Sequence, residues 1–121
     1  MARWTLWVAL AAAMAFALIW ALTPPAHAET GIASFYGAKF HGRKTASGER
    51  FDMNAATCAS RKYRFGTRLK VINQETGKSA TCRVNDRGPY SGGRILDVSR
   101  SVAARLGMIQ SGTARVRITR Q

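Results

Sequence analysis

Apolar and polar residues alternate along the second half of the chain, which predicts short β-strands. An apolar residue at every second position places one face of a strand toward a core. Five segments are apolar or alternating enough to be strands: 31–37, 68–73, 79–85, 95–99 and 114–120. Gly77 lies in 74–78, between two of them, so we expect a hairpin turn there. In 79–85 we expect Asn85 to face solvent.

Two further elements follow from local signals. Ser99 is a favourable N-cap for a short helix over 100–106, and Gly107 is a favourable terminator. We interpret 51–54 as a sixth short strand or extended segment, and 55–62 as a helical turn. About six short strands and one helix make the chain mainly β. A closed barrel is the arrangement that leaves so few strands without edges.

Residues 1–28 have a different pattern and predict a secretory signal peptide. Arg3 supplies a positive start, 4–22 is apolar except for Thr5, and the segment ends in Ala-His-Ala at Ala28. The competing interpretation is an uncleaved membrane anchor. The segment holds no cysteine, so no lipid anchor is expected. The remaining residues, 29–121, form one domain.

The chain has 19 Lys and Arg against six Asp and Glu, a formal net charge of +13. Such a charge informs about partners rather than fold. Export makes nucleic acid an unsuitable partner, which leaves the anions of the cell envelope: peptide carboxylates, wall polymers and lipid phosphates. The alternative is a charged surface that only keeps the protein soluble.

Cys58 and Cys82 are the two cysteines. An exported chain folds in an oxidising compartment, so we predict a disulfide between them. Two buried free thiols are the alternative. Metal chemistry lacks ligands, because His41 is the one histidine of 29–121. A Ser-His-Asp set is one alternative, although the chain has no nucleophile-elbow pattern. Carboxylates are the other candidate groups, and they suit glycosidic bond cleavage, which needs an acid to protonate the leaving oxygen.

Three ordered blocks resemble the rare lipoprotein A (RlpA-like) family, a branch of the double-psi β-barrels. The blocks are GIASFYGAKFHGRKTASGERFD, FGTRLKV and RVNDRGPYSGGRILDVSRSVAARLGM, and they cover roughly 31–120. The resemblance implies a small six-stranded double-psi β-barrel. It also implies an endolytic lytic transglycosylase of peptidoglycan. Such an enzyme cuts MurNAc–GlcNAc bonds without water, leaves 1,6-anhydro-MurNAc ends, and acts especially on strands stripped of stem peptides.

The resemblance also implies which residues form the site. Four carboxylates are the catalytic candidates: Glu49, Asp52, Asp86 and Asp97. Of these we prefer Asp86 as the acid and base. Six residues are expected to contact substrate: Tyr36, His41, Ser60, Arg87, Tyr90 and Arg94. Ser60 stands where many family members have a histidine.

Structural roles for the two central aspartates are the alternatives. Asp86 would accept a bond from the Gly88 amide in a turn, or pair with Arg87 or Arg94. Asp97 precedes the predicted helix and would accept bonds from its first amides.

The sequence predicts an exported monomer of the periplasm or cell envelope, with peptidoglycan glycan strands as partner and no cofactor or metal. A non-catalytic, expansin-like peptidoglycan-binding module is the competing hypothesis. A small defence or inhibitor protein on the same barrel is a third.

Export with cleavage is directly testable. Mass spectrometry of the exported protein should find an N-terminus at Glu29, because the Ala-His-Ala site ends at Ala28. An exported form that retains Met1 would support the membrane-anchor interpretation instead.

Overall fold

The computed structural model of the protein describes residues 28–121, so the predicted signal peptide lies outside the described residues apart from Ala28. The elements are β1 (Glu29–Phe35), η1 (Ala38–Phe40), β2 (Thr57–Ala59), β3 (Arg68–Asn73), β4 (Ser79–Asp86), β5 (Arg94–Val98), α2 (Arg100–Leu106) and β6 (Thr113–Arg120). Within this part of the chain, no helix has the length and hydropathy needed to span a membrane.

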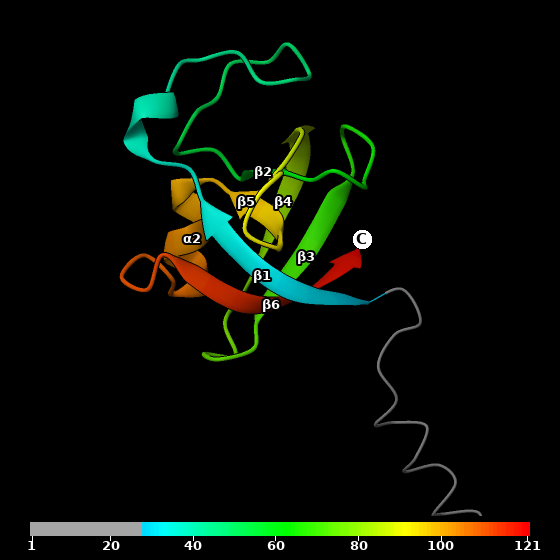
Figure 1. The fold of residues 1–121 in the computed structure, drawn as a ribbon, viewed down its shortest axis with the longest axis vertical. Coiled ribbons are helices and arrows are strands. Elements are labelled where there is room, and N and C mark those ends of the chain that lie inside the picture. Colours follow the sequence, from blue (N-terminus) through cyan, green and yellow to red (C-terminus); the bar gives the residue numbers. More distant parts are fainter. Residues whose placement is uncertain (1–27) are drawn as a thin grey trace, which may run out of the picture.

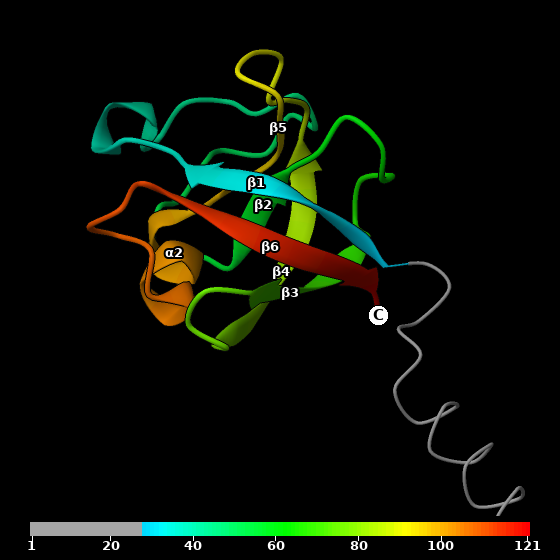
Figure 2. The same cartoon turned by 60° about the horizontal axis from the view of Figure 1, so that its bottom comes forward.

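The six strands close into a barrel in the order β1-β5-β2-β4-β3-β6 (Figure 1). β1 pairs with β5, and β2 with β4, in parallel, whereas the other neighbouring pairs are antiparallel. Helix α2 packs against one end of the barrel (Figure 2). The prediction of a mainly β, six-stranded barrel with one short helix is confirmed.

Local signals placed the helix correctly. The Ser99 hydroxyl accepts a hydrogen bond from the Val102 amide, which caps α2 at its start. Gly107 ends the helix with φ 71°, in the left-handed region where a side chain would be strained. The hairpin turn between β3 and β4 likewise has Gly77 at φ 76°. These positions are decided by neighbouring residues, which is why the sequence revealed them.

Two segments differ from the predictions. Residues 55–62 contain the strand β2 rather than a helical turn, and 51–54 are not a strand, since 53–54 lie in a turn. All three residues of β2 are buried, and β4 and β5 pair with its two edges. A strand of three buried residues has no polar face, so alternation could not reveal it. Asn85 was also predicted to face solvent, but its side chain is buried.

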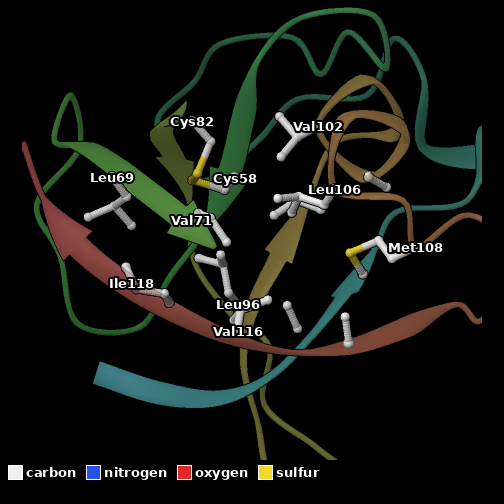
Figure 3. Close-up of a cluster of buried hydrophobic side chains, with 14 of the residues drawn as sticks. Cys58, Leu69, Val71, Cys82, Leu96, Val102, Leu106, Met108, Val116 and Ile118 are labelled. Atoms are coloured by element: carbon white, nitrogen blue, oxygen red, sulfur yellow. A yellow bond between two sulfur atoms is a disulfide. The ribbon is translucent and has the colours of Figure 1, made fainter. Parts of the chain in front are cut away.

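All six strands contribute side chains to the core inside the barrel, and helix α2 adds further apolar side chains (Figure 3). The side chains that are fully buried and largest are Leu69, Leu96, Leu106, Met108, Ile118, Val71, Val84, Val98, Val102 and Val116, together with Asn73 and Asn85. Asn73 donates to the carbonyl of Leu106 at 2.8 Å, which ties the last turn of α2 to the β3–β4 hairpin.

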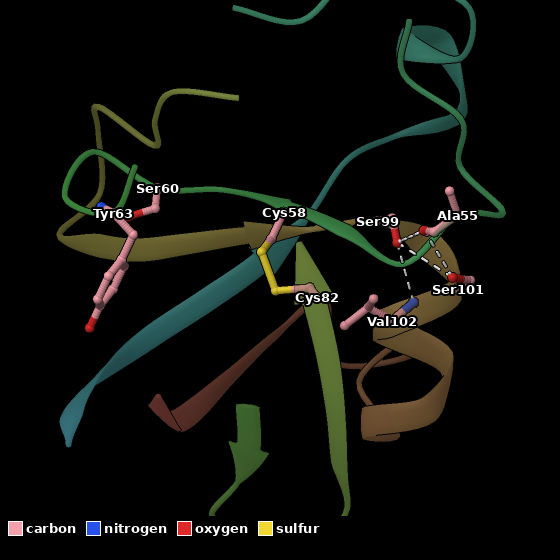
Figure 4. Close-up of a disulfide and its surroundings, with 8 residues drawn as sticks. All are labelled: Ala55, Cys58, Ser60, Tyr63, Cys82, Ser99, Ser101 and Val102. Carbon is pink, nitrogen blue, oxygen red and sulfur yellow. Dashed lines mark hydrogen bonds between the residues drawn. A yellow bond between two sulfur atoms is a disulfide. The ribbon is translucent and has the colours of Figure 1, made fainter. Parts of the chain in front are cut away.

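A disulfide joins Cys58 of β2 to Cys82 of β4, with their Cα atoms 5.7 Å apart (Figure 4). Both residues are fully buried. The predicted pairing is therefore confirmed. The bond closes a loop with a sequence separation of 24, so it restricts the unfolded chain and fixes the shortest strand in the barrel.

The double substitution Cys58→Ala/Cys82→Ala should lower the free energy of unfolding by about 3 kcal/mol, because it releases the closed loop in the unfolded chain. Urea titration followed by circular dichroism measures this difference. A reducing agent should destabilise the wild type and leave the variant unchanged. Equal stability of the wild type and the variant would contradict a stabilising bridge.

Candidate active site

A row of register partners crosses four strands at one end of the barrel. Ser34 of β1 pairs with Asp97 of β5, Asp97 pairs with Ala59 of β2, and Ala59 pairs with Asp86 of β4. Neighbouring strands lie about 4.8 Å apart, so the backbones of the two aspartates are about 10 Å apart. The small side chain of Ala59 stands between them.

An extra residue in β4 orients Asp86. The register of β2 against β4 shifts between Cys58 and Ala59, so that Val84 is matched to Cys58 but Asp86 to Ala59. Asn85 is therefore the extra residue of a bulge. If side chains alternated strictly after the buried Val84, the Asp86 side chain would point into the core. The bulge lets it point away from the core instead. The β1–β5 pair has a similar shift before Asp97.

Asp86 is partly buried and accepts three hydrogen bonds. The Tyr36 hydroxyl donates to its Oδ2 at 2.7 Å, and the amides of Ala46 and Arg87 donate to its Oδ1 at 2.9 and 2.8 Å. Among residues 28–121, no charged side-chain nitrogen of Lys, Arg or His lies within 4.0 Å of its carboxylate. Neither predicted structural alternative holds, because the turn amide is that of Arg87 and no arginine side chain pairs with Asp86.

Tyr36 is held as a hydrogen-bond donor. Burial raises the pKa of its hydroxyl far above the ordinary value, and the hydrogen bond to Asp86 and the negative charges of Asp86 and Asp97 raise it further. Its ring packs on Phe40 and edge-on against Phe51, with centroids 5.8 and 4.6 Å away. The hydroxyl therefore keeps its proton at any physiological pH and in this structure donates it to Asp86.

Asp97 has a cationic partner, in contrast to Asp86. Its Oδ1 accepts from the Ser34 hydroxyl and from the Arg94 guanidinium, the latter at 3.0 Å. Arg94 also donates to the Ser34 hydroxyl and to the Ser91 carbonyl. The predicted alternative, a carboxylate that caps α2, is wrong, since the Ser99 hydroxyl does this.

Glu49 closes the loop after η1 onto β4. Its carboxylate accepts from both terminal nitrogens of Arg83, at 2.7 and 3.1 Å, and from the Asn85 amide at 2.9 Å. The hydrogen bonds from Arg83, and then that from Asn85, lower the pKa of Glu49. This clamp holds the loop whose Ala46 amide binds Asp86.

Asp52 and His41 lie in the same loop but support its turns. Asp52 accepts from the Asn54 amide at 2.9 Å, and the His41 Nδ1 accepts from the Met53 amide at 3.2 Å. Both side chains are on exposed residues. No hydrogen bond or ion pair within 28–121 joins either to Asp86 or Asp97.

Ser60 and Arg87 shape the turn after β2, in which Figure 4 shows Ser60 and Tyr63. The buried Ser60 hydroxyl accepts from the amides of Lys62 and Tyr63 at 3.0 and 3.2 Å. Arg87 donates to the carbonyls of Ser60 and Tyr63 and lies over the ring of Phe65, 3.9 Å from its centroid. The Ser60 hydroxyl and the Arg87 guanidinium thus make their hydrogen bonds to groups of the protein itself.

Tyr90 is the most exposed large aromatic side chain in the described residues, at 76%. It lies in the β4–β5 loop, which rises above the barrel with the segment 36–56 in Figure 2. Sequence reasoning did not find Ser34 or the Ala46 amide. Ser34 had a signal, its outward position in a predicted strand, whereas a backbone amide has none.

The arrangement offers one partly buried carboxylate without a cation and one paired with arginine, about 10 Å apart across Ala59. Proton transfer by a carboxyl group is the chemistry that this supports. Within residues 28–121, no group of three or more His, Cys, Asp or Glu side chains converges to hold a metal.

Solved structures share this fold. The Streptomyces papain inhibitor superposes with a TM-score of 0.62 at 18% identity, over 79% of this chain and 96% of that protein. A variant expansin of Clavibacter michiganensis in complex with cellohexaose gives 0.61 at 16%, over 78% and 50%. At such identities the likeness establishes the barrel alone.

Sequence relatives are much closer. The endolytic peptidoglycan transglycosylase RlpA of Neisseria meningitidis serogroup A is 52% identical over 90 residues, 74% of this chain and 38% of the relative. The protein of that name from Vibrio cholerae is 47% identical over 95 residues, 78% of this chain and 36% of the relative. This chain thus spans less than two fifths of either relative.

The family model described as lytic transglycolase matches residues 28–118, which include strands β1 to β5, most of β6 and every candidate residue described above. Together with the identities near 50%, this match shows that the chain belongs to the RlpA-like lytic transglycolase family of double-psi β-barrels.

Proposed function

We propose that this protein is an endolytic lytic transglycosylase that cleaves MurNAc–GlcNAc bonds of peptidoglycan and leaves 1,6-anhydro-MurNAc ends. The relatives named as endolytic peptidoglycan transglycosylases support the reaction. The single structural observation that carries the proposal is Asp86, a partly buried carboxylate without a cation partner in the described residues. The protein acts in the cell envelope, in the periplasm, after export, and works as a monomer.

Asp86 is the acid and base. As a carboxylic acid it gives its proton to the GlcNAc oxygen while the bond from that oxygen to C1 of MurNAc breaks. The 6-hydroxyl of the same MurNAc then attacks C1 and closes the anhydro ring. Asp86, now a carboxylate, takes the proton that this hydroxyl releases, so the enzyme is regenerated and no water is consumed.

The contact with Tyr36 suits both protonation states. A phenol hydroxyl can donate a hydrogen bond to a carboxylate or accept one from a carboxylic acid. Rotation of the Tyr36 hydroxyl therefore preserves its 2.7 Å contact with Asp86 when the proton moves. Tyr36 is a positioning residue in this mechanism.

The other carboxylates are less suited to donate a proton. Arg83 lowers the pKa of Glu49, so Glu49 is ionised and holds the loop that carries Ala46. Arg94 pairs with Asp97, so Asp97 supplies negative charge opposite the sugar. Asp52 and His41 shape the rim of the site, and the exposed Tyr90 stacks on a sugar ring.

A non-catalytic peptidoglycan-binding module is the second candidate. It is favoured by Ser60, which stands where the family resemblance implies a histidine and whose hydroxyl accepts two amide hydrogen bonds. A serine hydroxyl does not exchange protons near neutral pH as an imidazole does. Within the first candidate, the enzyme, the same substitution predicts slow turnover.

Asp86→Asn should reduce anhydro-muropeptide release from purified sacculi by about a hundredfold or more, because it removes the group that transfers the proton. Chromatography with mass spectrometry of the soluble products measures this. Binding to sacculi, followed by co-sedimentation, should change little.

Asp52→Asn is the matched control and should keep most of the activity, since Asp52 lies in an exposed turn. Full activity of a folded Asp86→Asn variant would exclude the mechanism. Sedimentation of the wild type with sacculi, without any product, would support the binding module.

Glu49→Gln should make the Ala46 amide exchange its hydrogen about two to five times faster at pH 6.5, because an exposed ion pair contributes modestly to closing the loop. Exchange measured by NMR tests this. The pKa of Glu49 is lowered, so the clamp is complete above the ordinary glutamate pKa. It weakens as the pH falls through the lowered value, and the difference between variant and wild type should vanish there.

Glu75→Gln serves as the control for this loop, since Glu75 accepts a hydrogen bond from the distant Arg115 amide. Unchanged Ala46 exchange in Glu49→Gln would show that the clamp does not hold the loop.

A further inference from the structure

A depression rich in arginine lies along the outer face of the barrel, beside the candidate active site. It has a volume of about 360 Å³ and is lined by Arg68 of β3, Arg83 and Thr81 of β4, Arg105 of α2, and the residues 55–57 that lead into β2. Four separate segments thus converge on it, three of them with an arginine.

The positive charges of this depression repel one another, which lowers the stability of the fold. Arg68 and Arg83 are direct register partners in the antiparallel β3–β4 pair, an arrangement in which like charges repel. Glu49 neutralises Arg83. Within residues 28–121, neither Arg68 nor Arg105 has a carboxylate within 4.0 Å. Two arginines are therefore free to bind an external anion.

The charged surface continues around Arg68. A second depression of about 380 Å³ shares this residue and is also lined by Arg64, 66–67, Arg120 and Gln121. Arginine presents a planar fork of donors that matches a carboxylate with two hydrogen bonds. The two adjoining depressions therefore suit a ligand with more than one carboxylate.

The same two strands lead from this surface to the candidate site. Thr57 pairs with Arg83 at the depression, and Ala59 pairs with Asp86 at the site. Asp86 is three positions after Arg83 in the strand, about 10 Å at the usual rise per residue. A glycan strand at Asp86 would thus bring its own substituents near Arg68 and Arg105.

We propose that Arg68 and Arg105 bind carboxylates of the peptides attached to peptidoglycan, so that peptide-bearing glycan is held more tightly than bare glycan. This inference rests on the proposed function, because it takes peptidoglycan as the substrate. It differs from the preference for stripped strands that the family resemblance implies. The number and spacing of free arginines in this chain support a carboxylate-bearing ligand.

An anionic membrane is a less suitable occupant. Stable membrane association combines basic residues with apolar side chains that enter the lipid. The exposed large apolar residues of the described chain are Phe65 and Tyr90. Neither lines the depression, and Arg87 stacks on Phe65.

The test compares the binding of two soluble fragments, a GlcNAc–MurNAc disaccharide with its peptide and the same disaccharide without it, at low salt. Calorimetry should give tighter binding of the peptide-bearing fragment to the wild type. In Arg68→Gln/Arg105→Gln its Kd should rise about tenfold, the loss expected for charge-assisted hydrogen bonds. The Kd for the bare disaccharide should stay unchanged.

Arg100→Gln/Arg115→Gln is the matched control, because it removes the same charge from exposed positions outside both depressions. Equal weakening in this control, or equal weakening of both fragments, would overturn the proposal. Loss of binding to anionic lipid vesicles in Arg68→Gln/Arg105→Gln, with fragment binding retained, would overturn it in favour of a membrane surface.

The proposed function is judged separately by anhydro-product release from peptide-free strands, which Arg68→Gln/Arg105→Gln should leave unchanged. Selective binding of the peptide-bearing fragment without any product would reject the enzyme and keep the peptide site.

Discussion

The short strand β2 is flanked by β4 on one side and β5 on the other, and the candidate site depends on this pairing. It puts Ala59 between Asp86 and Asp97, while Cys58, one residue earlier, is bridged to Cys82. The register shift beside Ala59 turns Asp86 out of the core. Barrel closure and the position of the carboxylates are thus consequences of the same three buried residues.

The few carboxylates of this basic chain have distinct environments. Glu49 and Asp97 are each bound by an arginine, and both thereby fasten loops around the site. Asp86 is surrounded by uncharged donors, one of which, Tyr36, can reverse the direction of its hydrogen bond. Asp86 differs from these neighbours because no arginine side chain pairs with it among residues 28–121.

The sequence predicted the features that depend on residues close together in the chain. These are the alternating strands, the turn at Gly77, and the helix between Ser99 and Gly107. Strand β2 was not predicted, because its pairing partners are distant in the chain and its three buried residues show no alternation. The candidate acids were found through the family resemblance. Their partners were not, because the Ala46 amide and the Ser34 hydroxyl reach them only after the barrel closes.

The central claim is that a carboxyl group cleaves the glycan with the sugar's own hydroxyl as nucleophile, so no water enters the product. Digestion of purified peptidoglycan in water enriched in oxygen-18, followed by mass spectrometry of the new MurNAc ends, tests this most directly. The account predicts ends that are lighter than hydrolysed ends by one water and carry no heavy oxygen. Labelled reducing ends, or no new ends at all, would contradict it.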